Sequence, residues 1–297
     1  MNSSLKLLTA ATSLILAAAC TAKETADDAV VSADTGTAAP ASTAGPNVVT
    51  ITASDYKFAA PDQIPAGLTT FKLLDTGKEV HHASLIRLKD GKTYADMMAA
   101  MKALKPGTQP PAWIEPLGGP GAIVPGGGSN ATVMLEPGNY ALVCFVPDPN
   151  MVPHFMHGMT KGFTVTPAST AAASVAPEPT TDITLTLSDY KFDWSKPLTA
   201  GPHVIRVETA AGQPHEVVLF QIPPGKTLKD LQTWLNGMKG EPPAMPIGGV
   251  SGLVAGKPTY FSVDLKPGDY AAVCFLEDHK DGKPHFVHGM TQAIKIS

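Results

Sequence analysis

The chain has 297 residues, of which only 16% are charged, and its formal net charge at pH 7 is −4. It contains no basic run or basic stripe, so no nucleic-acid partner is expected. Glycine and proline are plentiful, with 27 and 28 copies, and this favours short strands joined by turns over long helices. At about 100–200 residues per domain, the length predicts two domains.

The N-terminus has the pattern of an export signal. Lys6 precedes an apolar stretch, residues 7–19, that is too short to span a bilayer as a helix. Small residues stand directly before Cys20, which resembles the bacterial lipobox, whose cysteine becomes the lipidated first residue of the mature protein. We therefore expect residues 1–20 to be a lipoprotein signal peptide, with lipidation at Cys20. The protein would be exported and lipid-anchored to a bacterial membrane, facing the periplasm or the cell exterior. An ordinary signal peptide cut near Ala19 is the alternative.

The two halves of the chain repeat one another. Residues 55–58, with the sequence DYKF, recur as residues 189–192 at an offset of 134 positions. A glycine pair at residues 118–119 recurs at residues 248–249 at an offset of 130, so an intervening loop is four residues shorter in the second copy. We interpret this self-similarity as a tandem duplication of a whole domain.

The segments outside the repeats are rich in Ala, Ser and Thr and show no apolar periodicity, as is typical of flexible linkers. The predicted organisation after the signal peptide therefore has four parts. They are a tether at residues 21–46, a first domain at residues 47–166, a linker at residues 167–180 and a second domain at residues 181–297.

Within each repeat, apolar and polar residues alternate over short runs, which is the period of a strand with one buried face. Residues 49–52 show this alternation, and Gly- and Pro-containing turns separate the later runs. One helix per repeat is predicted, at residues 94–104 and 228–238, with Asp96 and Asp230 in the first turn, where the helix dipole favours a carboxylate. These features predict an all-β protein of two tandem Greek-key β-sandwich domains, each with one short helical insertion.

Beyond Cys20, each repeat holds a single cysteine, Cys144 in the first and Cys274 in the second. An exported protein usually pairs its cysteines or lacks them, so one unpaired thiol per repeat needs an explanation. A metal ion would hold the sulfur as a thiolate and withdraw it from disulfide chemistry. A buried inert cysteine in each repeat and a disulfide between the repeats are the alternatives.

Each of these cysteines belongs to an ordered set of residues that occurs in both repeats. A histidine comes first, then Gly-x-Tyr-x-x-x-Cys, then His-x-x-x-Gly-Met. This set resembles that of the cupredoxins, blue-copper proteins such as plastocyanin, and the resemblance spans both repeats. It implies a cupredoxin-like domain in each repeat with up to two copper ions per chain, one per domain. The implied ligands are His81, Cys144, His154 and Met159 in the first repeat, and His215, Cys274, His285 and Met290 in the second. Two imidazoles, a thiolate and a weak axial thioether suit copper electron transfer.

Three further histidines are alternative ligands. His82 follows His81 directly, but the offset of 134 positions pairs His81 with His215 and so favours His81. His157 and His288 lie between the implied loop histidine and methionine of each repeat. Each of these two is a candidate for an exposed edge residue, a conduit for protons or electrons, or the true ligand. The stretch from cysteine to histidine is also longer than in plastocyanin and closer in length to that of copper nitrite reductases.

The resemblance implies a membrane-tethered copper protein that transfers electrons to or from an unidentified redox partner protein. Copper storage, delivery or resistance is an alternative, and so is a metal-free binding module on the same fold. The protein is not expected to be an enzyme, because multicopper enzymes of this kind carry a histidine beside the blue-copper cysteine. Here valine and phenylalanine flank both Cys144 and Cys274.

Overall fold

The structure, a computed structural model, describes residues 45–105, 108–168, 176–210 and 212–297. The predicted signal peptide with Cys20, nearly all of the predicted tether and half of the predicted linker lie outside the described residues. In the described part of the chain, no helix is both long and apolar enough to cross a membrane. The described residues all fall within one compact unit, so the division into two domains stays a prediction that rests on the repeat.

The first repeat folds into two sheets around one core. Its elements are β1 (Asn47–Ser54), β2 (Lys57–Ala59), β3 (Gln63–Pro65), β4 (Gly67–Asp75), β5 (Ser84–Leu88), α1 (Tyr94–Ala103), β6 (Ile114–Pro116), β7 (Gly128–Leu135), β8 (Gly138–Val143), the 3-10 turn η1 (His154–His157) and β9 (Thr160–Thr166). One sheet has the strand order β3-β9-β8-β5-β6, and the other contains β7-β4-β1-β2. β1 pairs with β4 in parallel, whereas β4 and β7 are antiparallel.

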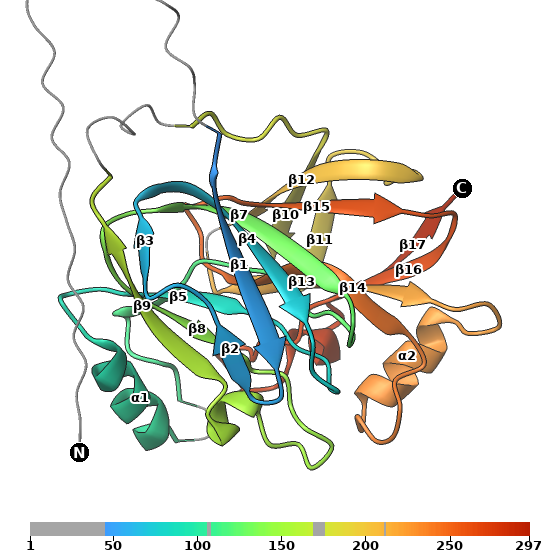
Figure 1. The fold of residues 1–297 in the computed structure, drawn as a ribbon. Helices are drawn as coiled ribbons and strands as arrows, with labels where there is room; N and C mark the ends of the chain where they lie inside the picture. Colours follow the sequence, from blue (N-terminus) through green and yellow to red (C-terminus); the bar gives the residue numbers. More distant parts are fainter. Residues whose placement is uncertain (1–44, 106–107, 169–175, 211) are drawn as a thin grey trace, which may run out of the picture. The chain divides into compact units, whose positions relative to one another are not determined.

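The second repeat has the same plan. Its elements are β10 (Ile183–Ser188), β11 (Lys191–Trp194), β12 (Gly201–Thr209), β13 (His215–Ile222), α2 (Leu228–Leu235), β14 (Met245–Leu253), β15 (Thr259–Leu265), β16 (Gly268–Val273), the 3-10 turn η3 (His285–His288) and β17 (Thr291–Ile296). One sheet is β14-β13-β16-β17, and the other contains β11-β10-β12-β15. β7 and β15 pair at Thr132 and Tyr260. The sheet β7-β4-β1-β2 of the first repeat and the sheet β11-β10-β12-β15 of the second therefore join into one eight-stranded sheet (Figure 1).

The core of each repeat follows from the alternation in the sequence. Every second residue of β1 from Val49 onwards is buried, because successive side chains of a strand point to opposite faces. Burying such an aliphatic side chain fully contributes about 1.5–3 kcal/mol. Cys144 and Met159 belong to the first apolar core, and Cys274 and Met290 belong to the second. The predicted all-β architecture is thus confirmed, and it places both cysteines inside the sandwiches.

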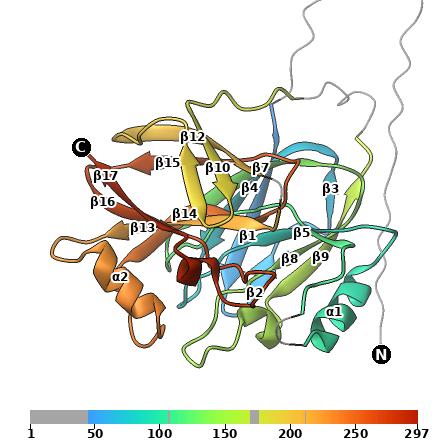
Figure 2. The same ribbon diagram turned by 180° about the vertical axis from the view of Figure 1, so that it is seen from behind.

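The two predicted helices are present as α1 and α2, each packed near one end of its repeat (Figures 1 and 2). Each begins with a capping box: the side chain of Thr93 or Thr227 accepts from the N–H three residues later, and Asp96 or Asp230 accepts from the cap N–H in return. The two aspartates therefore satisfy backbone donors directly, in addition to the predicted dipole effect. α2 ends at Leu235, three residues before the predicted end.

The recurring glycine pairs lie at the junction between the repeats. The Gly121 N–H donates to the Gly249 carbonyl at 3.0 Å, and the Gly118 N–H donates to the Gly252 carbonyl at 2.8 Å. Backbone segments of the two repeats therefore pair directly with each other. A Cβ at Gly119 would lie 2.3 Å from the Ala83 carbonyl oxygen, and one at Gly249 would lie 2.0 Å from the Val217 carbonyl oxygen. The recurring glycines therefore let each segment approach the neighbouring backbone of its own repeat.

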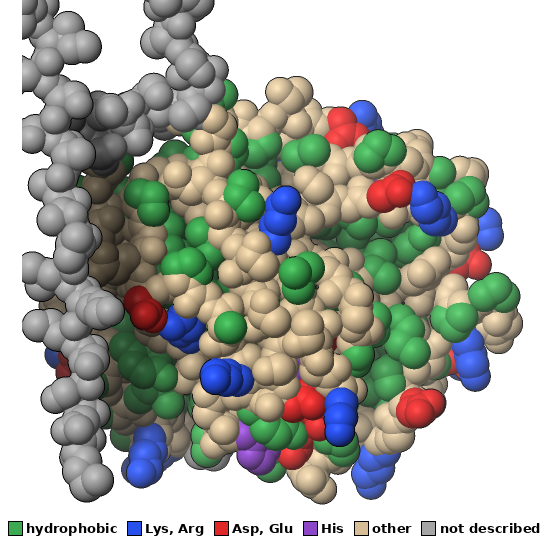
Figure 3. All heavy atoms as spheres, in the orientation of Figure 1, with side chains coloured by type: hydrophobic (Ala, Val, Ile, Leu, Met, Phe, Trp, Pro, Cys, Tyr) green, Lys and Arg blue, Asp and Glu red, His purple; other side chains and the backbone are tan. Residues whose placement is uncertain are grey.

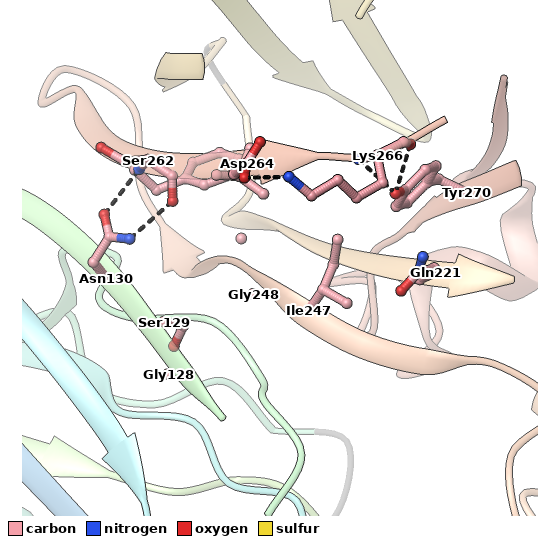
Figure 4. Close-up of a pocket in the computed structure, with 13 residues that line it drawn as sticks. Gly128, Ser129, Asn130, Gln221, Ile247, Gly248, Ser262, Asp264, Lys266 and Tyr270 are labelled. Carbon is pink, nitrogen blue, oxygen red and sulfur yellow. Dashed lines mark hydrogen bonds and ion pairs between the residues drawn. The ribbon is translucent and has the colours of Figure 1, made fainter. Parts of the chain in front are cut away.

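A small hollow lies beside this junction, between β7 of the first repeat and β14 and β15 of the second (Figure 4). Its volume is about 270 Å³. At its rim the Asn130 side chain donates to the Ser262 carbonyl and accepts from the Ser262 N–H, both at 2.8 Å. Asn130 and Ser262 thus satisfy each other's polar groups at this rim.

Candidate metal centres

The first centre gathers three residues that are far apart in the sequence. His81 precedes β5, Cys144 follows β8, and His154 begins η1. Their potential ligand atoms all lie within 4.8 Å of one another, and all three residues are fully buried. The Nδ1 atoms of His81 and His154 are 3.1 Å apart, and Cys144 Sγ is 3.5 Å from His154 Nδ1. Met159 is also fully buried, and its carbonyl accepts from the Cys144 N–H.

The second centre repeats this arrangement with His215, Cys274 and His285. The Nδ1 atoms of the two histidines are 3.2 Å apart, and Cys274 Sγ is 3.3 Å from His285 Nδ1. Met290 is fully buried, and its carbonyl accepts from the Cys274 N–H. Both cysteines are free, so an interdomain disulfide is not formed.

The alternative histidines lie outside both three-residue groups. His82 Nε2 accepts from the Phe145 N–H at 2.8 Å, and in the second repeat the Glu216 carboxylate accepts from the Phe275 N–H at 3.0 Å. His82 therefore supports the backbone beside the cysteine. Burial lowers the pKa of His82 to about 3, so this acceptor is neutral at pH 7.

His157 and His288 lie nearer the surface and contact carboxylates. His157 Nε2 is 3.2 Å from Asp148, and His288 Nε2 is 3.1 Å from Asp281. Asp278, Asp281 and His288 also form a small group of possible metal ligands. The Asp278 carboxylate in that group already accepts hydrogen bonds from the Tyr190 hydroxyl and other donors.

Hydrogen bonds at the far side of the imidazoles show whether the first centre fits a metal ion. His81 Nε2 lies 3.0 Å from the Asp55 carboxylate, and His154 Nε2 lies 2.8 Å from the Glu79 carboxylate. A carboxylate only accepts, so each Nε2 carries the proton and each Nδ1 presents a lone pair. Two nitrogen lone pairs and a sulfur then face one another, and a cation that replaces the thiol proton would be bound by all three. Carboxylate–histidine–metal arrangements of this kind orient metal-binding histidines.

The second centre fits in the same way but is supported differently. His215 Nε2 lies 3.2 Å from the Asp189 carboxylate. His285 Nε2 is buried without a hydrogen-bond partner and lies 3.9 Å from Asp278. At the offset of 134 positions, Gln213 stands where the first repeat has Glu79, and its amide donates to Asp278 at 2.8 Å. The two centres therefore share their inner residues and differ in the carboxylate behind the loop histidine, which is hydrogen-bonded to it in the first centre and 3.9 Å away in the second.

Burial sets the protonation of the inner residues. It raises the pKa of the Cys144 thiol to about 12 and also raises that of Cys274 well above its usual range. It lowers the pKa of His285 to about 4 and that of His154 in the same direction, although Glu79 opposes the shift at His154. At pH 7 the imidazoles of His154 and His285 are thus neutral and ready to bind, whereas a metal must displace the thiol proton. Metal binding is accordingly expected to release protons.

Sequence reasoning missed the residues behind the imidazoles. Asp55 and Asp189 were visible only as part of the recurring DYKF motif, and Glu79 carried no signal at all. The available clue was that Asp-Tyr recurs at the same 134-position offset as His81 and His215. Residues that keep the same sequence spacing to a ligand in both repeats are candidates for contact with it.

The chain was also compared with known proteins. No family model and no curated protein matches the chain. Among solved structures, it is similar to a dithionite-reduced auracyanin from Roseiflexus castenholzii, with 20% identity over 42% of this chain and 100% of that chain at a TM-score of 0.30. Auracyanin A of Chloroflexus aurantiacus, described as a blue copper protein, is 18% identical over 41% and 100% of the two chains, with a TM-score of 0.29. A copper-containing nitrite reductase from Thermus scotoductus is 10% identical over 84% and 61%, with a TM-score of 0.23.

Each repeat has a cupredoxin-like fold, and each contains a His/Cys/His group that could hold a copper ion. The expectation that the protein is not an enzyme is contradicted, because the matched structures include multicopper oxidases and a nitrite reductase. That expectation rested on the residues beside Cys144 and Cys274. They argue only against a second copper bound through an adjacent histidine, which is too narrow a test to exclude catalysis on this fold.

Proposed function

We propose that the protein binds one copper ion in each repeat and transfers electrons. The ligands would be His81, Cys144, His154 and Met159 in the first repeat and His215, Cys274, His285 and Met290 in the second. The observation that carries this proposal is the convergence of two Nδ1 atoms and one Sγ atom in each repeat, with Nε2 of three of the four histidines held by carboxylates. Nitrogen and sulfur donors in this combination are typical of blue-copper electron-transfer sites.

When bound, copper supplies a one-electron change between Cu(II) and Cu(I). The chain's part is to keep the donor atoms in place during that change. Paired backbones fix these residues: His81 forms a bridge with Ile123, and His215 pairs with Leu253 of β14. The strands that precede the two cysteines are held by the pairing of β5 with β8 and of β13 with β16. The fully buried donors also exclude water from the metal. Both features favour fast electron exchange, because little rearrangement accompanies it.

Export and anchoring belong to the same proposal. The protein would be tethered through lipidated Cys20 to a bacterial membrane and would meet a redox partner protein outside the cytoplasm. Support comes from the pattern of residues 1–20 and from the two buried cysteines that stay unpaired, as copper-bound thiolates would in an oxidising compartment. Labelled fatty acid incorporated into the wild-type chain but not into a Cys20→Ala variant would test the anchor.

Addition of Cu(II) to a soluble form that starts after Cys20 is expected to produce an intense thiolate-to-copper absorption band. Saturation is expected at two ions per chain, one for each group. The single variants Cys144→Ser and Cys274→Ser should each lose one ion and part of the band, and the double variant should lose the band entirely. A wild-type protein that binds Cu(II) without such a band would contradict the electron-transfer proposal.

Copper delivery is a second candidate function, favoured by exposed thioethers at the first centre only. Met151 and Met156 lie on the ligand loop with 47% and 61% of their surface exposed, and soft thioethers suit Cu(I). In the second repeat, Val287 takes the place of Met156. A Met151→Leu/Met156→Leu variant that loads and releases Cu(I) at the wild-type rate would remove the support for this candidate.

A further inference from the structure

The histidines of both centres are closed off from solvent. His154 and His285 have no exposed surface, and at the first centre the outer nitrogen of His154 is covered by the Glu79 carboxylate. An external electron donor therefore cannot touch the imidazole of a ligand. Electrons that reach either centre must pass through another group that contacts a ligand on one side and the surface on the other.

Tyr56 is such a group at the first centre. Its ring packs edge-on against His154, with the centroids 4.9 Å apart, and stacks on His157 at 4.6 Å with an angle of 28° between the rings. The Tyr56 hydroxyl donates to Glu79 at 3.1 Å, which fixes the ring between the two histidines. His157 is exposed, with 35% of its side-chain surface accessible. The three rings thus form a continuous stack from the surface to a ligand.

The second repeat builds the same stack from equivalent residues. Tyr190 packs against His285 at 5.7 Å and against His288 at 5.0 Å, and its hydroxyl donates to Asp278. The carboxylate that holds the tyrosine differs between the repeats, since it is Glu79 in one and Asp278 in the other. The ring order is nevertheless retained, which indicates that the stack itself matters.

The phenylalanine beside each cysteine is the competing route, and it is less consistent. Phe145 is 37% exposed but packs on Phe155 and His82, neither of which belongs to the three-residue group. Its counterpart Phe275 is half-buried.

On the face drawn in Figure 3, histidine and acidic side chains lie together at the lower edge, so imidazole and carboxylate groups do reach the surface side by side.

We propose that the stacks Tyr56–His157 and Tyr190–His288 are the ports through which electrons enter and leave the two centres. This inference rests on the proposed electron-transfer function. One electron would pass from an external one-electron donor through the rings to bound Cu(II), which would be reduced to Cu(I). No bond forms or breaks, and the rings end in the state in which they began. The recurring Asp-Tyr pair thus supplies both a carboxylate for the strand histidine and the ring of the port.

The test isolates the first centre in a Cys274→Ser background, loaded with Cu(II). Bleaching of the blue band by hexaammineruthenium(II) is followed by stopped flow, with the absorption spectrum and the reduction potential recorded for each variant. Tyr56→Leu is expected to slow reduction about tenfold, equivalent to about 1.4 kcal/mol of activation free energy. Tyr56→Phe keeps the ring and should restore most of the rate. Phe145→Leu, the matched control, should leave the rate unchanged.

The outcomes distinguish the proposed electron port from the proposed copper function. Retention of the blue band by Tyr56→Leu with a slower reduction at matched potential supports the port. An unchanged rate in Tyr56→Leu, or a slower rate in Phe145→Leu, overturns it while leaving the copper function intact. If the parent protein with an intact first centre shows no blue band, the proposed function fails and the port fails with it. The same series on Tyr190 in a Cys144→Ser background tests the second port.

Discussion

Replacement of Glu79 by glutamine is expected to weaken Cu(II) binding at the first centre by about ten- to hundredfold, the usual effect of losing a group that supports a metal-binding histidine. The His154 Nε2–H donates to the Glu79 carboxylate, with 2.8 Å between nitrogen and oxygen. The negative charge of Glu79 makes Nδ1 a stronger electron-pair donor to copper. Glutamine has nearly the same shape but no charge. Competition titration with a chelator in a Cys274→Ser background, followed at the blue band, measures the change.

The reduction potential of the Glu79→Gln variant is expected to rise, because the lost charge stabilises Cu(II) more than Cu(I). Glu115→Gln is the matched control, since Glu115 lies in β6 and pairs with Lys89, away from the centre. An unchanged affinity in Glu79→Gln would mean that the carboxylate does not act on the copper through His154. It would also argue against copper as the reason why the Nδ1 atoms of His81 and His154 lie so close together.

The second repeat already contains this change, since Gln213 occupies the position of Glu79. The two centres therefore have the same inner residues, but the carboxylate behind the loop histidine is hydrogen-bonded to it only in the first, since Asp278 lies 3.9 Å from His285 Nε2 in the second. We expect the first centre to have the lower potential and the tighter Cu(II) binding, with electrons flowing to the second. Separate potentials in the two single-cysteine variants would show the order directly.

The sequence was sufficient to predict the all-β fold, because that fold depends on local patterns, and it singled out the histidines and cysteines that the structure brings together. Strand alternation and helix capping are read from neighbouring residues, and the repeat selected His81 over His82 by its offset. The prediction that His154 and His285 come together with the cysteines agrees with the three-residue groups, while their role as ligands stays a prediction.

The supporting residues could not be predicted in the same way. Glu79 meets His154 across 75 positions of sequence, and Asp55 meets His81 across 26, so only the folded topology brings them together. The Glu79 and Gln213 pair also breaks the repeat, which hid their common place in the two sites. The pairing of the two repeats at their junction could not be predicted for another reason. It is formed by backbone groups of glycine-rich segments, and these carry no side-chain pattern that would indicate their partner.

Substitution of Gly249 by alanine is expected to lower the free energy of unfolding by about 4 kcal/mol, the sum of backbone strain and overpacking. Gly249 has a φ of +114°, and a Cβ there would lie 2.0 Å from the Val217 carbonyl oxygen. That carbonyl belongs to the backbone of β13, so no flexible side chain can yield. Guanidinium unfolding of the metal-free protein measures the loss.

The matched control is Gly225→Ala, which has a φ of +83° but no atom within 4 Å of the new Cβ, and which should cost only about 1 kcal/mol of backbone strain. The difference between the variants isolates the contact with Val217. Because Val217 lies two residues after His215 on β13, relief of that contact would displace the histidine from the second centre. Copper stoichiometry in Gly249→Ala is therefore expected to fall towards one ion per chain, with the first centre still loaded. A stable Gly249→Ala protein with two tightly bound ions would show that the junction can yield without moving β13.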